Sequence, residues 1–144
     1  MNSTKANKEM VRNAFEVINA LEYHKLDAFV SQDYLRHCQA TPDVKVECLE
    51  EFKALLREFD KTFTEVEIKI DMLIAEDDLV AFWGTYSANQ TGPMGPFPAT
   101  GKRMVSDMGG VHRIEDGKIA ETWVTWDNLS AFQQLGLDSS QIQG

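Results

Sequence analysis

The sequence predicts an α+β fold in which helices come first and an antiparallel sheet comes last. Apolar residues recur at helical spacing between residues 10 and 59, and the period changes to two near Phe63. Strand patterns follow the helical ones instead of alternating with them, which disfavours a parallel βαβ arrangement. A curved sheet that wraps amphipathic helices leaves a conical pocket, so we expect one between the two layers.

Length and charge narrow the class of protein. The 144 residues suit one domain, residues 1–144. Fourteen Lys and Arg against 23 Asp and Glu give a net charge of −9, which argues against nucleic acid and anionic membrane as partners. No apolar run approaches the roughly 20 residues that span a bilayer, and residues 1–10 lack a signal-peptide core. We therefore expect a cytoplasmic protein.

The cysteines and histidines show no metal-binding spacing. Cys38 and Cys48 lie ten residues apart without a C-x-x-C motif, which favours reduced thiols. Because the chain lacks a His/Cys cluster at ligand spacing, we expect no metal site.

Three helical segments are predicted in the first 60 residues. They cover residues 5–21, 24–30 and 46–59, each with apolar positions on one face. Residues 33–38, between the second and third helix, are predicted to be irregular or extended. Thr41-Pro42-Asp43 is a break before the third helix.

Four strands are predicted in the second half, at residues 66–74, 79–87, 102–114 and 118–127. The second strand is apolar on both faces, with Val80 and Phe82 on one and Leu79, Ala81 and Trp83 on the other. One face serves the core and the other needs a cover, so we expect a homodimer through the outer sheet face.

Two further segments are predicted outside these strands: a loop and a short helical turn. Residues 92–98 contain three prolines and form a loop before the third strand. Asn128 or Ser130 is expected to cap a last helical turn that ends at Gly136.

The dipeptide Asp116-Gly117 predicts a tight hairpin between the last two strands. If the turn has two residues, facing positions sum to 233, which pairs Gly110 with Trp123 and places Met108 and Asp127 on the same face. Gly109-Gly110 then either makes room for the indole or forms a bulge.

Asp127 ends the run Trp123-Val124-Thr125-Trp126-Asp127. A carboxyl group among tryptophans in an apolar pocket has a raised pKa and can move a proton near neutral pH. The alternative is an exposed strand end or a cap for the following helix. The local sequence taken alone favours this alternative.

The hairpin register separates the histidines. His112 faces Glu121, six residues or roughly 20 Å from the row of Asp127, so we expect it to be a cross-strand partner of Glu121 near the turn. His37 lies in the irregular segment, where pockets collect polar groups. His24 is expected at the surface.

Residues 112–127 resemble the terminal hairpin of the SnoaL-like polyketide cyclases, also called the ester cyclase group. The segments Phe132–Gly136, Pro98–Lys102 and Tyr34–His37 resemble that family's ending, the opening of its third strand and its early histidine motif. The resemblance implies the nuclear transport factor 2-like, or ketosteroid-isomerase-like, cone fold. In that fold three N-terminal helices pack in a curved, mainly antiparallel sheet.

The resemblance also implies a chemistry. Family members close a polyketide ring by intramolecular aldol condensation, with acid–base residues and no cofactor. Asp127 matches the aspartate that moves the proton, which reverses the preference above, and His37 matches the pocket histidine. Gln90-Thr91-Gly92 stands where many relatives carry His before Thr-Gly, and glutamine hydrogen-bonds without titrating.

The leading hypothesis is therefore a cofactor-independent acid–base enzyme of cyclase, isomerase or lyase type, acting on a small apolar or aromatic carbonyl compound. Asp127 and His37 are the expected catalytic residues, and Tyr34 or Tyr86 is a candidate to stabilise an enolate oxygen. The expected substrate-binding residues are Trp123, Met108, Trp126, Tyr34, Trp83, Tyr86 and Gln90. The alternatives are a water-adding enzyme of the epoxide hydrolase type and a non-catalytic dimeric module that binds a small ligand.

Overall fold

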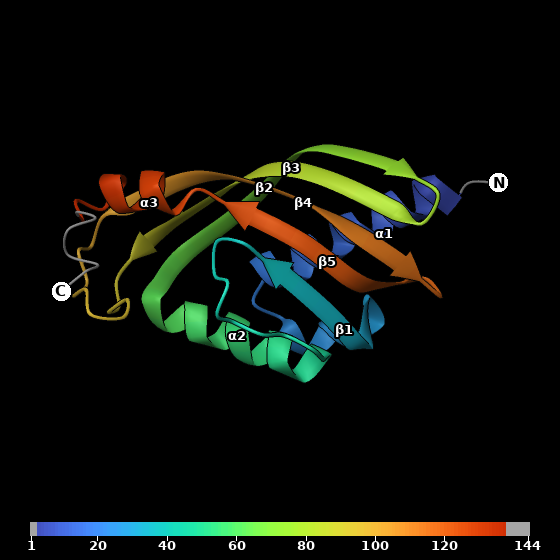
Figure 1. Ribbon diagram of the computed structural model, residues 1–144, viewed down its shortest axis with the longest axis horizontal. Coiled ribbons are helices and arrows are strands. Elements are labelled where there is room, and N and C mark those ends of the chain that lie inside the picture. The colour runs from blue at the N-terminus through green and yellow to red at the C-terminus, as the bar shows by residue number, and fades with distance from the viewer. Residues whose placement is uncertain (1–2, 138–144) are drawn as a thin grey trace.

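The computed structural model describes residues 3–137 as helices packed beneath one curved sheet (Figure 1). The helices are α1 (Ser3–Asn19), the 3₁₀ helix η1 (Tyr23–Ala28), α2 (Leu49–Thr62) and α3 (Asn128–Gln134). The strands are β1 (Val30–Cys38), β2 (Phe63–Glu76), β3 (Leu79–Gln90), β4 (Arg103–Glu115) and β5 (Lys118–Trp126). The sheet arches over α1 and α2, and α3 lies beyond one end of it.

The sheet has the order β1-β5-β4-β3-β2, with β1 parallel to β5 and every other pair antiparallel. This confirms the α+β class and the change of period near Phe63. The segment predicted to be irregular is instead part of β1, which adds a fifth strand at the sheet edge. Its pairing runs from Val30 opposite Ile119 to Cys38 opposite Val124. Such pairing between distant segments leaves no local sequence pattern.

The helical segments differ from the prediction at their ends. The second is a short 3₁₀ helix that stops at Ala28, because Val30 already pairs with β5. The third begins at Leu49, because Val46 is held in a bridge to Arg36 of β1. Within residues 3–137, no helix has the length and apolar character needed to cross a membrane.

The predicted turn between β4 and β5 is present, but the predicted register is not kept. Asp116 and Gly117 have φ angles of 53° and 76°, as a two-residue hairpin turn requires. Ile114 pairs with Ile119, but Arg113 pairs with Glu121, which leaves Ala120 as an extra residue in a β-bulge. The assumption of an unbulged hairpin is therefore wrong.

The bulge exchanges the two faces of β5. Glu121 and Trp123 turn to the outer face, and Thr122 and Val124 turn inward, where both are buried. The predicted partnership of His112 with Glu121 is therefore wrong: His112 of β4 is buried and pairs with Thr122.

The two adjacent glycines of β4 serve close packing on opposite faces. A Cβ at Gly110 would lie 2.1 Å from the carbonyl oxygen of Trp123, and a Cβ at Gly109 would lie 2.5 Å from the Trp83 ring. The predicted room for an indole is thus found at Gly109 and for Trp83. At Gly110 the neighbour is backbone of the paired strand.

Alanine substitutions distinguish these two roles. Gly110→Ala is expected to lower the free energy of unfolding by about 2–3 kcal/mol, because a backbone carbonyl cannot move aside without breaking strand pairing. Gly109→Ala is expected to cost less than about 1 kcal/mol, since the half-exposed Trp83 can shift. Urea unfolding measures both, and equal losses would contradict the assignment of the two faces.

Candidate functional site

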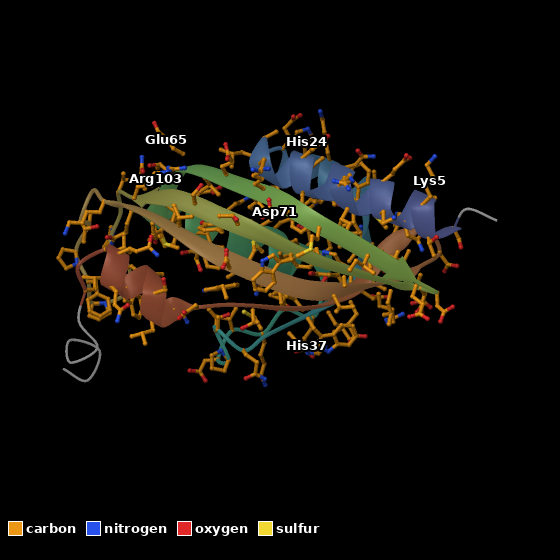
Figure 2. The ribbon with its side chains drawn as sticks, turned by 90° about the horizontal axis from the view of Figure 1, so that it is seen from above. Lys5, His24, His37, Glu65, Asp71 and Arg103 are labelled. Atoms are coloured by element: carbon orange, nitrogen blue, oxygen red, sulfur yellow. The ribbon has the colours of Figure 1, made fainter. Side chains whose placement is uncertain are left out.

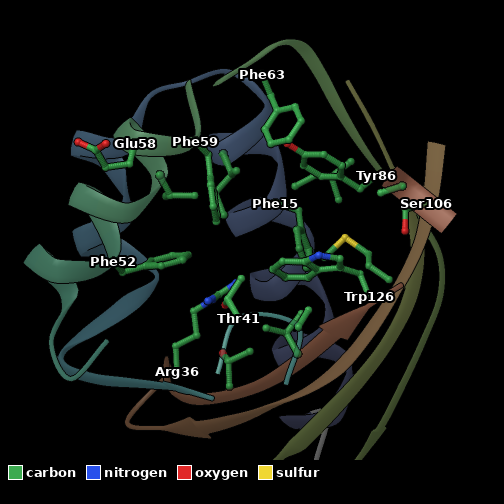
Figure 3. A pocket seen from close by; sticks show the side chains of 18 of the residues that line it. Phe15, Arg36, Thr41, Phe52, Glu58, Phe59, Phe63, Tyr86, Ser106 and Trp126 are labelled. Carbon is green, nitrogen blue, oxygen red and sulfur yellow. The ribbon is translucent and has the colours of Figure 1, made fainter. Parts of the chain in front are cut away.

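A cavity of about 540 Å³ lies between the inner face of the sheet and the helices (Figure 3). Residues of α1 and α2 form one wall, residues of all five strands form the other, and α3 closes one end. Most of the lining is aromatic or aliphatic, including Phe15, Phe52, Phe59, Phe63, Phe82, Met104, Met108 and Trp126. An apolar concave site with few polar groups is typical of small-molecule binding.

Three polar side chains form a connected group on the sheet side of this cavity. Nδ1 of His112 lies 2.7 Å from Oγ1 of Thr122, and the Thr122 hydroxyl lies near enough to the phenol of Tyr34 to lower its pKa. His112 packs face to face on Phe82, with ring centroids 4.8 Å apart. Its Nε2 is buried and has no partner among the described residues.

Burial keeps both ionisable members of this group neutral. Desolvation lowers the pKa of His112 to about 3. Desolvation raises the pKa of Tyr34 to about 12, although the Thr122 hydroxyl and the charge of Arg36 act in the opposite direction. At neutral pH the site therefore holds a neutral imidazole and a protonated phenol.

The hydrogen bonds can run in one direction through the group. If Nδ1 carries the proton of the neutral imidazole, it donates to Thr122 Oγ1 and leaves the Thr122 hydroxyl proton free for the Tyr34 oxygen. This order stabilises negative charge on Tyr34, in agreement with the lowering effect of Thr122 on its pKa. The Tyr34 O–H then remains available to a ligand in the cavity.

A second polar group lies at the end of β1 and β5. The guanidinium carbon of Arg36 lies 5.7 Å from the centroid of the Trp126 ring. Trp126 Nε1 donates to Asn128 Oδ1 at 2.8 Å, and Asn128 Nδ2 donates to the carbonyl of Ala40 at 2.6 Å. Asn128 thus fixes the indole and the chain after β1 in one place.

Asp127 does not lie in the cavity. Its side chain is exposed and accepts a hydrogen bond of 3.1 Å from the backbone N–H of Ser130, as the N-cap of α3. The expectation of a carboxyl group buried in the cavity is corrected here. The physical reason is that β5 ends at Trp126, and the next residue supplies the acceptor that the first turn of α3 needs.

His37 lies on the outer face of the sheet. Because β1 pairs in regular register from Leu35 to Cys38, side chains alternate there: Tyr34 and Arg36 point inward and His37 points outward. Its Nε2 is 2.7 Å from Glu121, and its ring stacks on Trp123 at 5.5 Å. The hydrogen bond with His37, followed by that with Arg113, holds the pKa of Glu121 below its usual range.

The expected substrate-binding residues divide between the two faces. Tyr34, Tyr86, Met108 and Trp126 line the cavity. Trp123 and Trp83 instead line a shallow groove on the outer face, because the bulge turned Trp123 outward and Trp83 points away from the core.

Gln90 is buried but holds the chain that follows β3 instead of lining the cavity. Its side chain donates to the carbonyls of Gly92 and Pro98 and accepts from the N–H and the hydroxyl of Thr100. The Gln90 amide group is therefore occupied by hydrogen bonds within the loop and is not available to a ligand.

Sequence reasoning missed Arg36, Thr122 and Asn128 and set His112 aside. One signal was present: Ile119 and Ala120 are adjacent apolar residues that break the alternation of β5, as a bulge does. The inward orientation of Arg36 depends on the pairing of β1 with β5, which the local sequence does not predict. Within residues 3–137, no group of three His, Cys, Asp or Glu side chains is arranged to hold a metal ion.

The curved sheet over helices, with its cavity, defines the nuclear transport factor 2-like cone fold. The fold is shared with IdmH of Streptomyces antibioticus, at 20% identity and a TM-score of 0.81 over 91% of this chain and 99% of that one. It is also shared with TsrD of Streptomyces laurentii (26%, 0.80, 92% and 96%) and a SnoaL-like protein of Jannaschia sp. CCS1 (17%, 0.85, 96% of both). No curated protein sequence gives a significant match.

The family model described as SnoaL-like polyketide cyclase matches residues 8–135. The chain therefore belongs to the SnoaL-like polyketide cyclase family, as its hairpin and tail predicted.

The buried histidine makes stability depend on pH. Because the pKa of His112 falls from 6.5 to about 3 on folding, the unfolded chain binds a proton in this window that the folded chain does not. This contribution is complete above pH 6.5 and is lost as the pH falls toward 3. His112→Gln keeps a partner for Thr122 but removes the titration.

Urea unfolding at pH 7 and pH 5 tests this point. The difference in unfolding free energy between the wild type and His112→Gln is expected to shift by about 2 kcal/mol against the wild type at the lower pH. Carboxylates titrate in both proteins and cancel in the comparison. The same substitution at the exposed His24 is the control. A difference that is the same at both pH values would show that His112 is not buried as a neutral group.

Proposed function

We propose that the protein is a cofactor-independent enzyme of cyclase or isomerase type that binds an apolar or aromatic carbonyl compound in the cavity. One observation carries the proposal: the cavity wall presents a phenol, Tyr34, backed by the hydroxyl of Thr122 and the imidazole of His112. A donor held ready for a carbonyl oxygen stabilises the enolate that forms when a neighbouring carbon loses a proton.

The neutral state of Tyr34 suits this role. A phenol whose pKa is raised to about 12 stays protonated and acts as a donor, not as a base. The cationic Arg36 and the Thr122 hydroxyl both stabilise charge that reaches Tyr34 in the transition state. Tyr86 of β3, also kept protonated by burial, offers a second phenol on the same cavity.

The proposed substrate has an acidic C–H bond. The only carboxylate that lines the cavity in the described part of the chain, Glu58, is paired with Lys61 and its side chain is 66% exposed. The proton of that C–H bond therefore passes to solvent water or hydroxide, and the protein contributes polarisation and positioning, which suits a carbon between two carbonyl groups, as in a polyketide chain.

Substitution of Tyr34 tests the proposal. Exchange of the α-hydrogens of β-tetralone in deuterated water, followed by NMR, reports enolisation in the cavity. Tyr34→Phe is expected to slow the protein-dependent exchange by about 10²–10³-fold, because one oxyanion donor is lost. Binding of the ketone, which depends on the apolar wall, is expected to change little.

Tyr23→Phe is the matched control. Tyr23 is a buried phenol bonded to Asp60 and is absent from the cavity lining, so its loss is expected to leave exchange intact. Binding without any protein-dependent exchange would favour the alternative of a small-ligand-binding module. Equal exchange in wild type and Tyr34→Phe would contradict the role of the phenol.

We further propose a homodimer through the outer face of the sheet. Figure 2 looks onto this face, with Asp71 on β2 and His37 on β1, the strands at its two edges. Large apolar side chains are exposed on it, among them Trp83 at 46%, Val105 at 50% and Trp123 at 42%. Several large apolar side chains exposed on one sheet face indicate an interaction surface.

Mass measurement by light scattering tests the dimer. The wild type is expected near twice 16.3 kDa, and Val105→Glu is expected to shift it to 16.3 kDa, because the substitution places a charge in the apolar patch. Leu129→Glu is the control, since Leu129 is exposed on α3 and not on a strand of the sheet. A wild-type mass of one chain at micromolar concentration would contradict the dimer.

A further inference from the structure

Arg36 is held in place at the mouth of the cavity. Its backbone N–H donates to Val46 at 3.0 Å on one side, and on the other side Arg36 pairs with Thr122 of β5. Figure 3 shows its guanidinium end reaching into the cavity toward Trp126, with Thr41 beside it. The backbone is thus fixed from both sides, and the charged group is directed at the space a ligand would fill.

This cation has no acidic partner within residues 3–137. Its contact is the face of Trp126, and that indole is in turn fixed by Asn128. A chain with a net charge of −9 offers many carboxylates, yet none pairs with the arginine that lines its apolar cavity. An unpaired guanidinium beside apolar walls is favourable only if an anion or water completes its hydrogen bonds.

A second donor lies next to it. The hydroxyl of Thr41 is buried and has no partner in the described part of the chain. Thr41 follows Ala40, whose carbonyl accepts from Asn128, so this hydroxyl is held at the same end of the cavity as Trp126. A buried hydroxyl without a partner is uncommon in folded proteins and indicates a missing acceptor.

We propose that Arg36 and Thr41 form a carboxylate subsite, so that the ligand is an amphipathic acid with its ring body in the cavity and its carboxylate at the mouth. The inference rests on the proposed function, because it places this ligand in the same cavity. The planar fork of a guanidinium matches the two oxygens of a carboxylate. One guanidinium and one hydroxyl match a ligand group with a single negative charge, such as a carboxylate, in a protein that is itself acidic.

Matched pairs of ligands test the subsite. The probes are naphthalene and anthracene carboxylates and the corresponding neutral carboxamides, which have nearly the same shape. Calorimetry on the wild type is expected to show the carboxylate bound about tenfold more tightly than the carboxamide. Arg36→Met, which keeps the length of the side chain and its packing on Trp126, is expected to abolish this preference and leave carboxamide affinity within about twofold.

Further variants separate charge, hydroxyl and fold. Arg36→Lys is expected to retain part of the preference, and Thr41→Val to reduce it without affecting the carboxamide. Arg12→Met makes the same change of charge on an exposed face of α1 and is expected to behave as the wild type. Thermal unfolding of each variant confirms that it folds.

The outcomes distinguish this inference from the function on which it rests. Carboxamides that bind while the wild type shows no preference for the acids, or a preference that survives Arg36→Met, would overturn the subsite and leave the cavity's proposed role intact. Failure of all probes to bind would overturn both.

Discussion

The single extra residue at Ala120 decides which side chains meet in this protein. Without the bulge, the alternation of β5 would direct Glu121 and Trp123 inward, and the cavity would contain a carboxylate. With it, Thr122 faces His112 and the acidic residue moves to the outer face, where it binds His37 and Arg113. One backbone irregularity therefore keeps the carboxylate of Glu121 on the outer face and turns the uncharged Thr122 toward the cavity.

The sequence pattern predicted the fold more completely than it predicted the residues of the site. The change of period and the Asp116-Gly117 turn are local features, and both appear in the structure as predicted. The side of β5 that faces the cavity depends on one residue of register, and a shift of one residue reverses every side chain beyond it. For that reason Met108, on the strand without the bulge, lies in the cavity, whereas Trp123 does not.

The edge strand β1 could not be predicted in the same way. Its partner, β5, is more than 80 residues away in the sequence, so the hydrogen bonds that make it regular are not visible in its own residues. A resemblance matched His37 to a pocket position, but strict alternation from the buried Tyr34 places residue 37 on the opposite face. The resemblance also matched Asp127 to a pocket position, but its carboxylate caps the helix that begins at Asn128.

Tyr34 and Arg36 are held at a fixed spacing in the proposed site. They are two residues apart on one strand, so their side chains leave the backbone about 7 Å apart on the same face. Pairing with β5 and the bridge to Val46 prevent either residue from sliding along the sheet. A rigid ligand held by its carboxylate at Arg36 would therefore present a carbonyl to Tyr34 only when the two groups are separated by a similar distance. In the proposed site, selection by this spacing would need no further polar groups, so an almost entirely apolar cavity could still distinguish carbonyl compounds of equal size.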